Sequence, residues 1–347
     1  MSRLLLRCEQ RIRNYSQMSR HVGMIRATVP VLARLNMFKS IYKLQIEVTT
    51  RCNLRCVMCE HTYWRQKPKS MSLENFKKAI TSLPNLINVD ITGIGETLLY
   101  EHFIEAIRFL REHNIFISFT TNLTLPIKPD IMNSIIDNAG MVKISIDAST
   151  KETYEQIRRG ANWDITIKNL ETLIEAKTKR NNGPKIQVVY TILEENFHEI
   201  IKAVYIFSSI GVDRICFQIP QLKDFQWHRD NRDLIYHAIE SSKELYNSKK
   251  CEINFSKYEL DKPVIHICSN AYNNAFITVD GDVFPCCFIH HGGNRSDYLK
   301  YSFGNIFELE KQIQQSNQRK QFIQEFENNS VPVLCRRCPV YSFTEEK

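Results

Sequence analysis

Three cysteines stand close together near the start of the chain, at positions 52, 56 and 59. Thiolates bind zinc and iron-sulfur clusters, and gaps of three and two residues place all three sulfurs on one short loop. Three ligands are one fewer than a tetrahedral metal site or a four-iron cluster needs. Either His61 completes a zinc site, or one position stays open for a ligand from outside the chain.

A second group of cysteines lies in the last third of the chain. Its members are Cys268, Cys286, Cys335 and Cys338. Twelve residues separate the first of them from Gly281, and four residues separate Gly281 from the second. Four thiols could close either a zinc site or an iron-sulfur cluster. Cys287 adds a spare thiol, which could replace its neighbour as a ligand or merely pack.

The pattern between residues 41 and 220 predicts alternating strands and helices. Six β-rich runs each precede a helical segment, an order that favours a parallel sheet with helical crossovers. The expected strands are 42–48, 88–93, 115–122, 141–147, 185–193 and 213–219, and the expected helices are 73–82, 101–112, 130–138, 150–158, 164–180 and 197–210. Because a complete eight-unit barrel needs roughly 250 residues, we expect an α/β fold with a partial (β/α)6 TIM-type barrel.

Polar side chains share one face of most of these strands. Parallel strands packed on both sides are usually apolar on both faces. The polar face is therefore expected to line a cavity, with a solvent-exposed face as the alternative. Cys216 falls on this face of the sixth strand, beside Gln218. Its thiol could act as a hydrogen-atom donor, although a buried cysteine is more often a small apolar filler.

Composition divides the chain into four expected parts. Residues 41–221 form the partial barrel, 222–262 a charged helical connector, and 263–347 a smaller cysteine-rich C-terminal domain. Residues 1–40 form a basic extension, because nine Lys or Arg residues against one acidic residue within 1–43 account for the whole net charge of +8. This extension is expected to be a solvated helix with a basic face, an arm for an anionic surface, or a transit-like segment.

Hydropathy and cysteine usage favour a reducing compartment. The 347 residues contain no apolar run of about 18 that could span a membrane. The first residues lack the apolar core of a signal peptide. The eleven cysteines therefore indicate metal or cluster ligands rather than disulfides, and we expect a cytoplasmic protein.

Through "CNLRCVMC" at 52–59, the chain resembles the radical S-adenosylmethionine (SAM) superfamily. The resemblance implies that Cys52, Cys56 and Cys59 hold a [4Fe-4S] cluster whose free iron binds SAM. In that family, one electron from the reduced cluster cleaves SAM, and the 5'-deoxyadenosyl radical abstracts a substrate hydrogen atom. It also implies an electron donor such as flavodoxin or ferredoxin.

Two further segments match the family in the expected order. "TGIGE" (92–96) resembles the loop in which Gly93 and Gly95 approach the cofactor and Glu96 holds its ammonium group, with a plain turn as the alternative. "SIDA" (145–148) ends the fourth strand, where Ser145 or Asp147 could instead cap the next helix. The other cofactor-binding positions that the resemblance implies are Ser145 and Arg158 at the ribose or carboxylate and Met58 at the adenine, with Asn122 and Asp147 as weaker candidates.

The C-terminal cysteines, with "DGDVFPCC" at 280–287, resemble the SPASM extension of this superfamily, which carries auxiliary iron-sulfur clusters. The longer form of that pattern has two more cysteines after its CxxC pair, and here none follows Cys338. We therefore expect one auxiliary [4Fe-4S] cluster, with a four-cysteine zinc site as the alternative. Its expected ligands are Cys268, Cys286, Cys335 and Cys338.

The leading hypothesis is a radical SAM enzyme that oxidises, cross-links or epimerises its substrate, either a peptide or protein or a sugar-like small molecule. The alternative is a non-catalytic zinc or iron-sulfur protein, such as a regulator that binds nucleic acid through the basic N-terminal arm. Beyond residue 43 the basic and acidic residues balance. This balance disfavours the regulator, because nucleic-acid-binding faces carry a positive excess.

Overall fold

The computed structural model describes residues 40–63, 66–220, 226–246, 251–255, 268–289, 298–308, 313–328, 330–332, 335 and 338. Of the basic extension, only Ser40 falls within these ranges, so the predictions for that arm lie outside the described residues. Among the helices that are described, none combines the length and the apolar character needed to cross a membrane.

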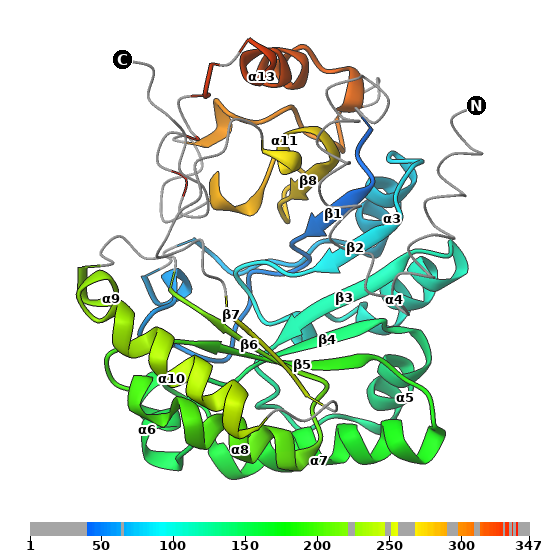
Figure 1. The fold of residues 1–347 in the computed structure, drawn as a ribbon. Helices are drawn as coiled ribbons and strands as arrows, with labels where there is room; N and C mark the ends of the chain where they lie inside the picture. Colours follow the sequence, from blue (N-terminus) through cyan, green and yellow to red (C-terminus); the bar gives the residue numbers. More distant parts are fainter. Residues whose placement is uncertain are drawn as a thin grey trace.

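One nine-stranded sheet organises the described residues, in the order β7-β6-β5-β4-β3-β2-β1-β8-β9 (Figure 1). Neighbouring strands run parallel except for β8 with β9, which are antiparallel. The strands are β1 (Lys43–Ile46), β2 (Asn88–Ile91), β3 (Phe116–Thr121), β4 (Met141–Ser145), β5 (Lys185–Thr191), β6 (Arg214–Gln218), β7 (Glu252–Phe255), β8 (Asn274–Ile277) and β9 (Val283–Phe284).

Helices connect the parallel strands and lie along the outer side of the sheet (Figure 1). Those of the barrel are α3 (Leu73–Thr81), α4 (Phe103–Glu112), α5 (Pro129–Asn138), α6 (Lys151–Ile157), α7 (Trp163–Arg180), α8 (Ile200–Ile210), α9 (Gln226–Asp230) and α10 (Arg232–Leu245). The C-terminal part adds α11 (Ser269–Asn273) and α13 (Asn317–Glu327). Short 3-10 turns are η1 (Glu60–Tyr63), η2 (Thr97–Leu99), η3 (Phe197–Glu199), η5 (Cys287–Ile289) and η6 (Ile313–Gln315).

The structure confirms the α/β fold with a partial barrel, because β1 to β6 each fall within an expected strand range. Local chemistry explains individual boundaries. Ser72 begins α3 as its N-cap, with its hydroxyl accepting a hydrogen bond from the Asn75 amide at 3.2 Å. Gly211 ends α8 with a φ of 101°, a left-handed conformation that glycine adopts without steric cost.

The sheet continues beyond the six expected strands at both edges. Part of the expected helical connector is helical, as α9 and α10, but it also contains β7, which pairs with β6. At the other edge β8 pairs with β1, so the cysteine-rich C-terminal part hydrogen-bonds directly to the barrel. Of the three added strands, β7 and β8 are four residues long, and β9, which pairs with β8, has two. Such short runs carry little periodic signal in the sequence.

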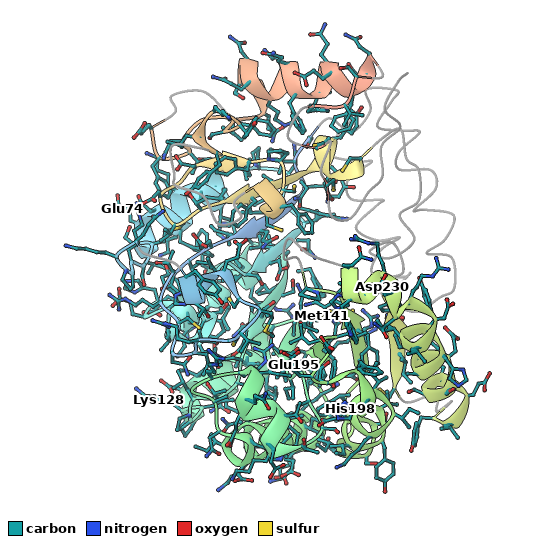
Figure 2. All side chains as sticks on the ribbon, turned by 90° about the vertical axis from the view of Figure 1, so that its left-hand side faces the viewer. Glu74, Lys128, Met141, Glu195, His198 and Asp230 are labelled. Atoms are coloured by element: carbon teal, nitrogen blue, oxygen red, sulfur yellow. The ribbon has the colours of Figure 1, made fainter. Side chains whose placement is uncertain are left out.

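The parallel order brings the C-terminal ends of β1 to β6 to one rim of the sheet. In Figure 2 the segments that follow β3, β5 and β6, marked by Lys128, Glu195 and Asp230, lie from left to right across the view. The loop that carries Cys52, Cys56 and Cys59 follows β1 at this rim. Parallel barrels assemble their active sites from such loops, so an active site is expected at this rim.

Candidate active site

The loop after β1 that carries Cys52, Cys56 and Cys59, here called the cysteine loop, is fastened on two sides. On one side it pairs with the end of α6, since the Arg55 amide donates to the Arg159 carbonyl and the Val57 amide donates to the Ile157 carbonyl, both at 2.9 Å. On the other side the Glu96 amide donates to the Arg51 carbonyl at 2.7 Å. These bonds fix the backbone that positions the thiols.

The thiols of Cys52, Cys56 and Cys59 are close enough to interact electrostatically. Burial raises the pKa of Cys52 to about 11 and also raises the pKa values of Cys56 and Cys59. The Arg158 guanidinium opposes this increase, with Nη1 at 3.9 Å from the Cys56 sulfur. Because metal binding requires thiolates, loading this loop must release protons.

His61, the candidate fourth zinc ligand, is already engaged within the protein. Its Nε2 lies 2.9 Å from the Thr50 carbonyl, which can only accept, so this nitrogen carries the proton. The other ring nitrogen, Nδ1, then accepts from Arg55 Nη1 at 3.4 Å. His61 is buried and braces the cysteine loop. These contacts disfavour a closed Cys3His zinc site.

Arg158 forms a buried ion pair beneath the cysteine loop. Its Nη2 lies 2.6 Å from the Asp147 carboxylate, whose side chain is 0% exposed. Asp147 also accepts from the Thr191 amide at 2.7 Å, so it joins β5 to Arg158. The buried Nε of Arg158 has no hydrogen-bond partner among the described residues. This orphaned donor beside Cys56 fits an arginine that holds an oxygen atom of the implied cofactor.

Glu96 and Asn122 link the strand ends around the cysteine loop. The buried Glu96 carboxylate accepts from Thr121 Oγ1 at 2.6 Å and from the amides of Asn122 and Leu98 at 2.7 and 3.1 Å. A carboxylate offers about four acceptor positions, so one remains for an ammonium group. The side-chain amide of Asn122 donates to Asn53 Oδ1 at 3.0 Å. It therefore braces the cysteine loop directly.

The two glycines of the 92–96 loop are required by the chain's own packing. A Cβ atom at Gly93 would lie 2.3 Å from the Cγ of Glu47, and one at Gly95 would lie 2.3 Å from the Thr49 carbonyl oxygen. Contact of this loop with the segment that leads into the cysteine loop is one reason for both glycines. The close approach to a cofactor that the resemblance implies stays a prediction.

A cavity of about 360 Å³ borders the cysteine loop. Its wall includes Met58, Cys59 and Gly93. The remaining lining residues are Gln45, Glu47, Glu60, Thr92, Ile94, Gln218, Ile219, Pro220, Phe276 and Cys287. Ser145 lies half-buried at the end of β4, on the same strand face as Lys143. The predicted cavity therefore exists at the rim, and several strands contribute polar residues to it.

The polar faces of β1 to β4 form one hydrogen-bonded network at this cavity. Asp90 pairs with Lys143 Nζ at 2.5 Å and accepts from the hydroxyls of Thr92 and Ser118 at 3.0 and 3.1 Å. Gln45 donates to the Thr92 carbonyl at 3.1 Å. Both charges of the Asp90–Lys143 pair are therefore satisfied inside the barrel. The alternation of polar residues along the strands was the sequence signal for this network.

Glu47 also lines the cavity, although no motif in the sequence pointed to it. Its side chain is buried and accepts from the Ile94 amide at 2.9 Å and from the Val279 amide at 3.3 Å. Burial raises the pKa of Glu47 to about 7. Its place on the polar face of the first strand was visible in the sequence, but its two partners come from distant loops.

The four C-terminal cysteines converge from separate segments. Cys268 precedes α11, Cys286 follows β9, and Cys335 and Cys338 lie beyond α13. The thiols of Cys286 and Cys335 each interact electrostatically with Cys268, and those of Cys335 and Cys338 interact with each other. Burial raises the pKa values of Cys268, Cys286 and Cys335. Sulfur donors from four residues that lie near one another suit an iron-sulfur cluster or a zinc ion.

No three His, Cys, Asp or Glu side chains of the described residues already surround a position for one metal ion. The ligand assignments therefore rest on residue type and on proximity. Cys216 is half-buried on β6 between β5 and β7, and it is not among the described residues that line the cavity. Its role as a hydrogen donor stays a prediction.

Two family models match the chain. The model of the Radical SAM superfamily matches residues 46–205, and the SPASM model, an iron-sulfur cluster-binding domain, matches residues 268–339. The two matched segments contain, respectively, the cysteine loop and all four C-terminal cysteines. The match between model and chain therefore includes both cysteine groups.

Curated relatives align over most of the chain. A cofactor-modifying protein for tungsten-containing aldehyde ferredoxin oxidoreductase from Pyrococcus furiosus is 25% identical over 76% of this chain and 78% of its own length. The mycofactocin maturase MftC of Mycolicibacterium smegmatis is 24% identical over 75% of this chain and 66% of its own. The subtilosin biosynthesis protein AlbA of Bacillus subtilis is 24% identical over 75% of this chain and 56% of its own length. This chain therefore spans little more than half of that relative.

Solved structures share the fold. SuiB of Streptococcus suis superposes with a TM-score of 0.67 at 16% identity, covering 92% of this chain and 80% of SuiB. The protein anSMEcpe, solved with bound AdoMet and a peptide, gives a TM-score of 0.58 at 19% identity over 86% of each chain. The sequence matches and the shared architecture agree: this chain is a radical SAM enzyme, a member of the radical SAM superfamily with a C-terminal SPASM domain.

Proposed function

We propose that Cys52, Cys56 and Cys59 hold a [4Fe-4S] cluster at which SAM is cleaved reductively, and that a hydrogen atom is then removed from a substrate in the adjoining cavity. When bound, the cluster and SAM supply the electron and the carbon-centred radical for this step. The observation that carries the proposal is a fastened loop of three thiols that borders the cavity, while the nearby His61 is occupied by other partners.

The surrounding residues have distinct roles in this proposal. Arg158 would offer its buried, unpartnered Nε to an oxygen atom of SAM, and Glu96 would offer its remaining acceptor position to the ammonium group. Met58 contributes an apolar surface to the cavity for the adenine. Gly93, Gly95 and Asn122 hold the loops that surround SAM, and Ser145 lies at the end of β4 as a further contact.

We assign one auxiliary [4Fe-4S] cluster to Cys268, Cys286, Cys335 and Cys338. Four protein ligands leave no iron open, which favours electron transfer or structural support over direct binding of substrate. A ferredoxin or flavodoxin is the proposed external electron donor.

A peptide or protein is the first candidate substrate. SuiB was solved bound to its precursor peptide SuiA, and anSMEcpe was solved with bound peptides. AlbA takes part in biosynthesis of the bacteriocin subtilosin. A sugar-like metabolite is the second candidate, because the cavity presents Gln45, Thr92 and Gln218, whose side chains can hydrogen-bond to hydroxyl groups.

The test is SAM cleavage by the anaerobically reconstituted protein after reduction with dithionite. We expect 5'-deoxyadenosine and methionine as products, and we expect none from the Cys56→Ala variant. Cys251→Ala is the matched control, because Cys251 is a thiol outside both cysteine groups. A wild-type protein that leaves SAM intact, or a Cys56→Ala variant that still cleaves it, would disprove the proposal.

A further inference from the structure

The adjacent residues Cys286 and Cys287 have different surroundings. The Cys286 thiol interacts with Cys268 and Cys335, which belong to the C-terminal cysteine group. The Cys287 thiol instead forms a side-chain hydrogen bond with Gln45 and interacts electrostatically with Asp90 and Lys143. Those three partners lie on β1, β2 and β4. One thiol of the pair therefore faces the auxiliary site, and the other faces the barrel.

Cys287 also lines the cavity that Met58 and Cys59 border. The Cys287 side chain is held in place by packing against the buried cluster of Phe276, Phe284 and Tyr298. The Asn274 side chain donates to the Pro285 carbonyl at 3.1 Å and so holds the backbone just before it. A substrate in the cavity can contact the cysteine loop on one wall and the Cys287 thiol on a wall built by a separate element.

We propose that Cys287 is a catalytic residue, a free thiol that returns a hydrogen atom to the substrate radical, while Cys286 is the ligand of the auxiliary cluster. This inference rests on the proposed function, which supplies the hydrogen abstraction. It defines the net reaction as inversion of a carbon centre, because the substrate loses one hydrogen atom from one side and gains another from a different wall of the cavity.

The proposed step is balanced. The S–H bond of Cys287 breaks homolytically, a C–H bond forms on the substrate carbon, and a thiyl radical remains on Cys287. An S–H bond is weaker than an aliphatic C–H bond, so the transfer runs downhill. One proton from water and one electron from a reduced iron-sulfur or flavin protein restore the thiol. Cys286 interacts electrostatically with Cys287, so as a ligand it would hold the auxiliary cluster close to the residue that receives this electron.

The same reasoning favours Cys287 over Cys216. Both thiols are half-buried, but of the two only Cys287 is among the described residues that line the cavity. Cys216 lies within β6, which is flanked by hydrogen-bonded strands on both sides.

The first experiment determines which thiols are ligands, without measuring activity. Cys286→Ser, Cys287→Ser and Cys251→Ala are reconstituted anaerobically, and their iron and sulfide contents are measured. We expect Cys287→Ser and Cys251→Ala to keep the wild-type contents and Cys286→Ser to lose iron. Loss of iron from Cys287→Ser, with the full content retained by Cys286→Ser, would overturn the assignment.

The second experiment tests hydrogen donation with SAM itself as the probe. The reduced holoprotein is incubated with SAM in D2O, where the thiol carries deuterium, and the 5'-deoxyadenosine is analysed by mass spectrometry. Because no substrate is present, the 5'-deoxyadenosyl radical in the same cavity accepts the deuterium: the S–D bond of Cys287 breaks and a C–D bond forms at the 5' carbon. We therefore expect one solvent deuterium in the wild-type product and loss of this label in Cys287→Ser and Cys287→Ala. Serine cannot replace the thiol, because its O–H bond is too strong to donate.

The outcomes separate this inference from the proposed function. Cleavage without any solvent label, or a label that persists in both Cys287 variants, overturns the role of Cys287 and leaves SAM cleavage intact. A label that disappears only in Cys216→Ser assigns donation to Cys216 instead. Absence of 5'-deoxyadenosine from the wild-type reaction refutes the proposed function itself, and the iron contents still decide whether Cys287 is a ligand.

Discussion

The two cysteine groups of this protein are built in opposite ways. The cysteine loop places three thiols within eight consecutive residues, and its backbone is fastened to α6 and to the 92–96 loop. The C-terminal group gathers four thiols from segments before α11, after β9 and beyond α13. A local loop can present an incomplete ligand set and stay open, whereas a set that spans 71 residues can close around its metal centre only when the chain has folded.

The two regions are nevertheless joined. The Glu47 carboxylate accepts from Ile94 in the barrel and from Val279 after β8, and Lys69 pairs with Asp280 at 2.6 Å. Pairing of β8 with β1 adds a backbone connection. We therefore expect each cysteine group to carry out its own chemical step, although both groups are held by the same sheet.

Removal of a ligand from the C-terminal cysteine group should have the largest effect, which is loss of substrate turnover. We expect Cys335→Ala to lose iron and to stop substrate turnover but to keep reductive cleavage of SAM, because the cysteine loop is fastened independently of Cys335. The measurements are iron content, 5'-deoxyadenosine and modified substrate, with Cys56→Ala as the reciprocal variant. Loss of SAM cleavage in Cys335→Ala would show that the two sites are not separable. Full turnover would make the auxiliary cluster merely structural.

Disruption of the buried ion pair beside the cysteine loop should have the next largest effect, which is a loss of stability. We expect Arg158→Met to lower the free energy of unfolding by about 3–5 kcal/mol, because it leaves the Asp147 carboxylate buried and without its charge partner. Urea unfolding of the protein checks this value. Arg159→Met is the matched control, since Arg159 is the exposed neighbour, and it should change stability little. A similar small loss for both variants would count against the importance of the pair.

Glu47, which joins the two regions, should give a smaller effect that depends on pH. The ordinary pKa of 4.5 rises to about 7 in the folded protein. Below pH 4.5 the group is protonated in both states; between that value and 7 only the unfolded chain ionises it. Stability contributed by Glu47 is therefore lost as pH rises through this window, by roughly 3 kcal/mol in total.

The Glu47→Gln variant isolates this dependence, because glutamine stays neutral. We expect the stability difference between variant and wild type to shift in favour of the variant as the pH rises from about 5 to about 7. Unfolding free energies measured at several pH values check the slope. Glu101→Gln, at an exposed position, should leave the slope unchanged. Parallel profiles for Glu47→Gln and wild type would show that Glu47 is ionised throughout.

The sequence by itself determined the elements whose signals are local. Alternating apolar residues predicted β1 to β6, the helical pattern over 73–82 predicted α3, and the spacing of Cys52, Cys56 and Cys59 predicted a ligand loop. Each depends on neighbours a few positions apart, whose side chains share a strand face, a helix end or a loop. The four C-terminal cysteines were also selected by spacing, through a resemblance to a known pattern.

Only the tertiary structure decided which distant groups meet. It turned Cys286 toward the other C-terminal cysteines and Cys287 toward Gln45, although the two residues are adjacent in sequence. It also paired Arg158 with Asp147 and joined β8 to β1. These contacts depend on the register and direction of strands far apart in the chain. Because a one-residue shift reverses the face that a side chain occupies, local sequence patterns could not decide them.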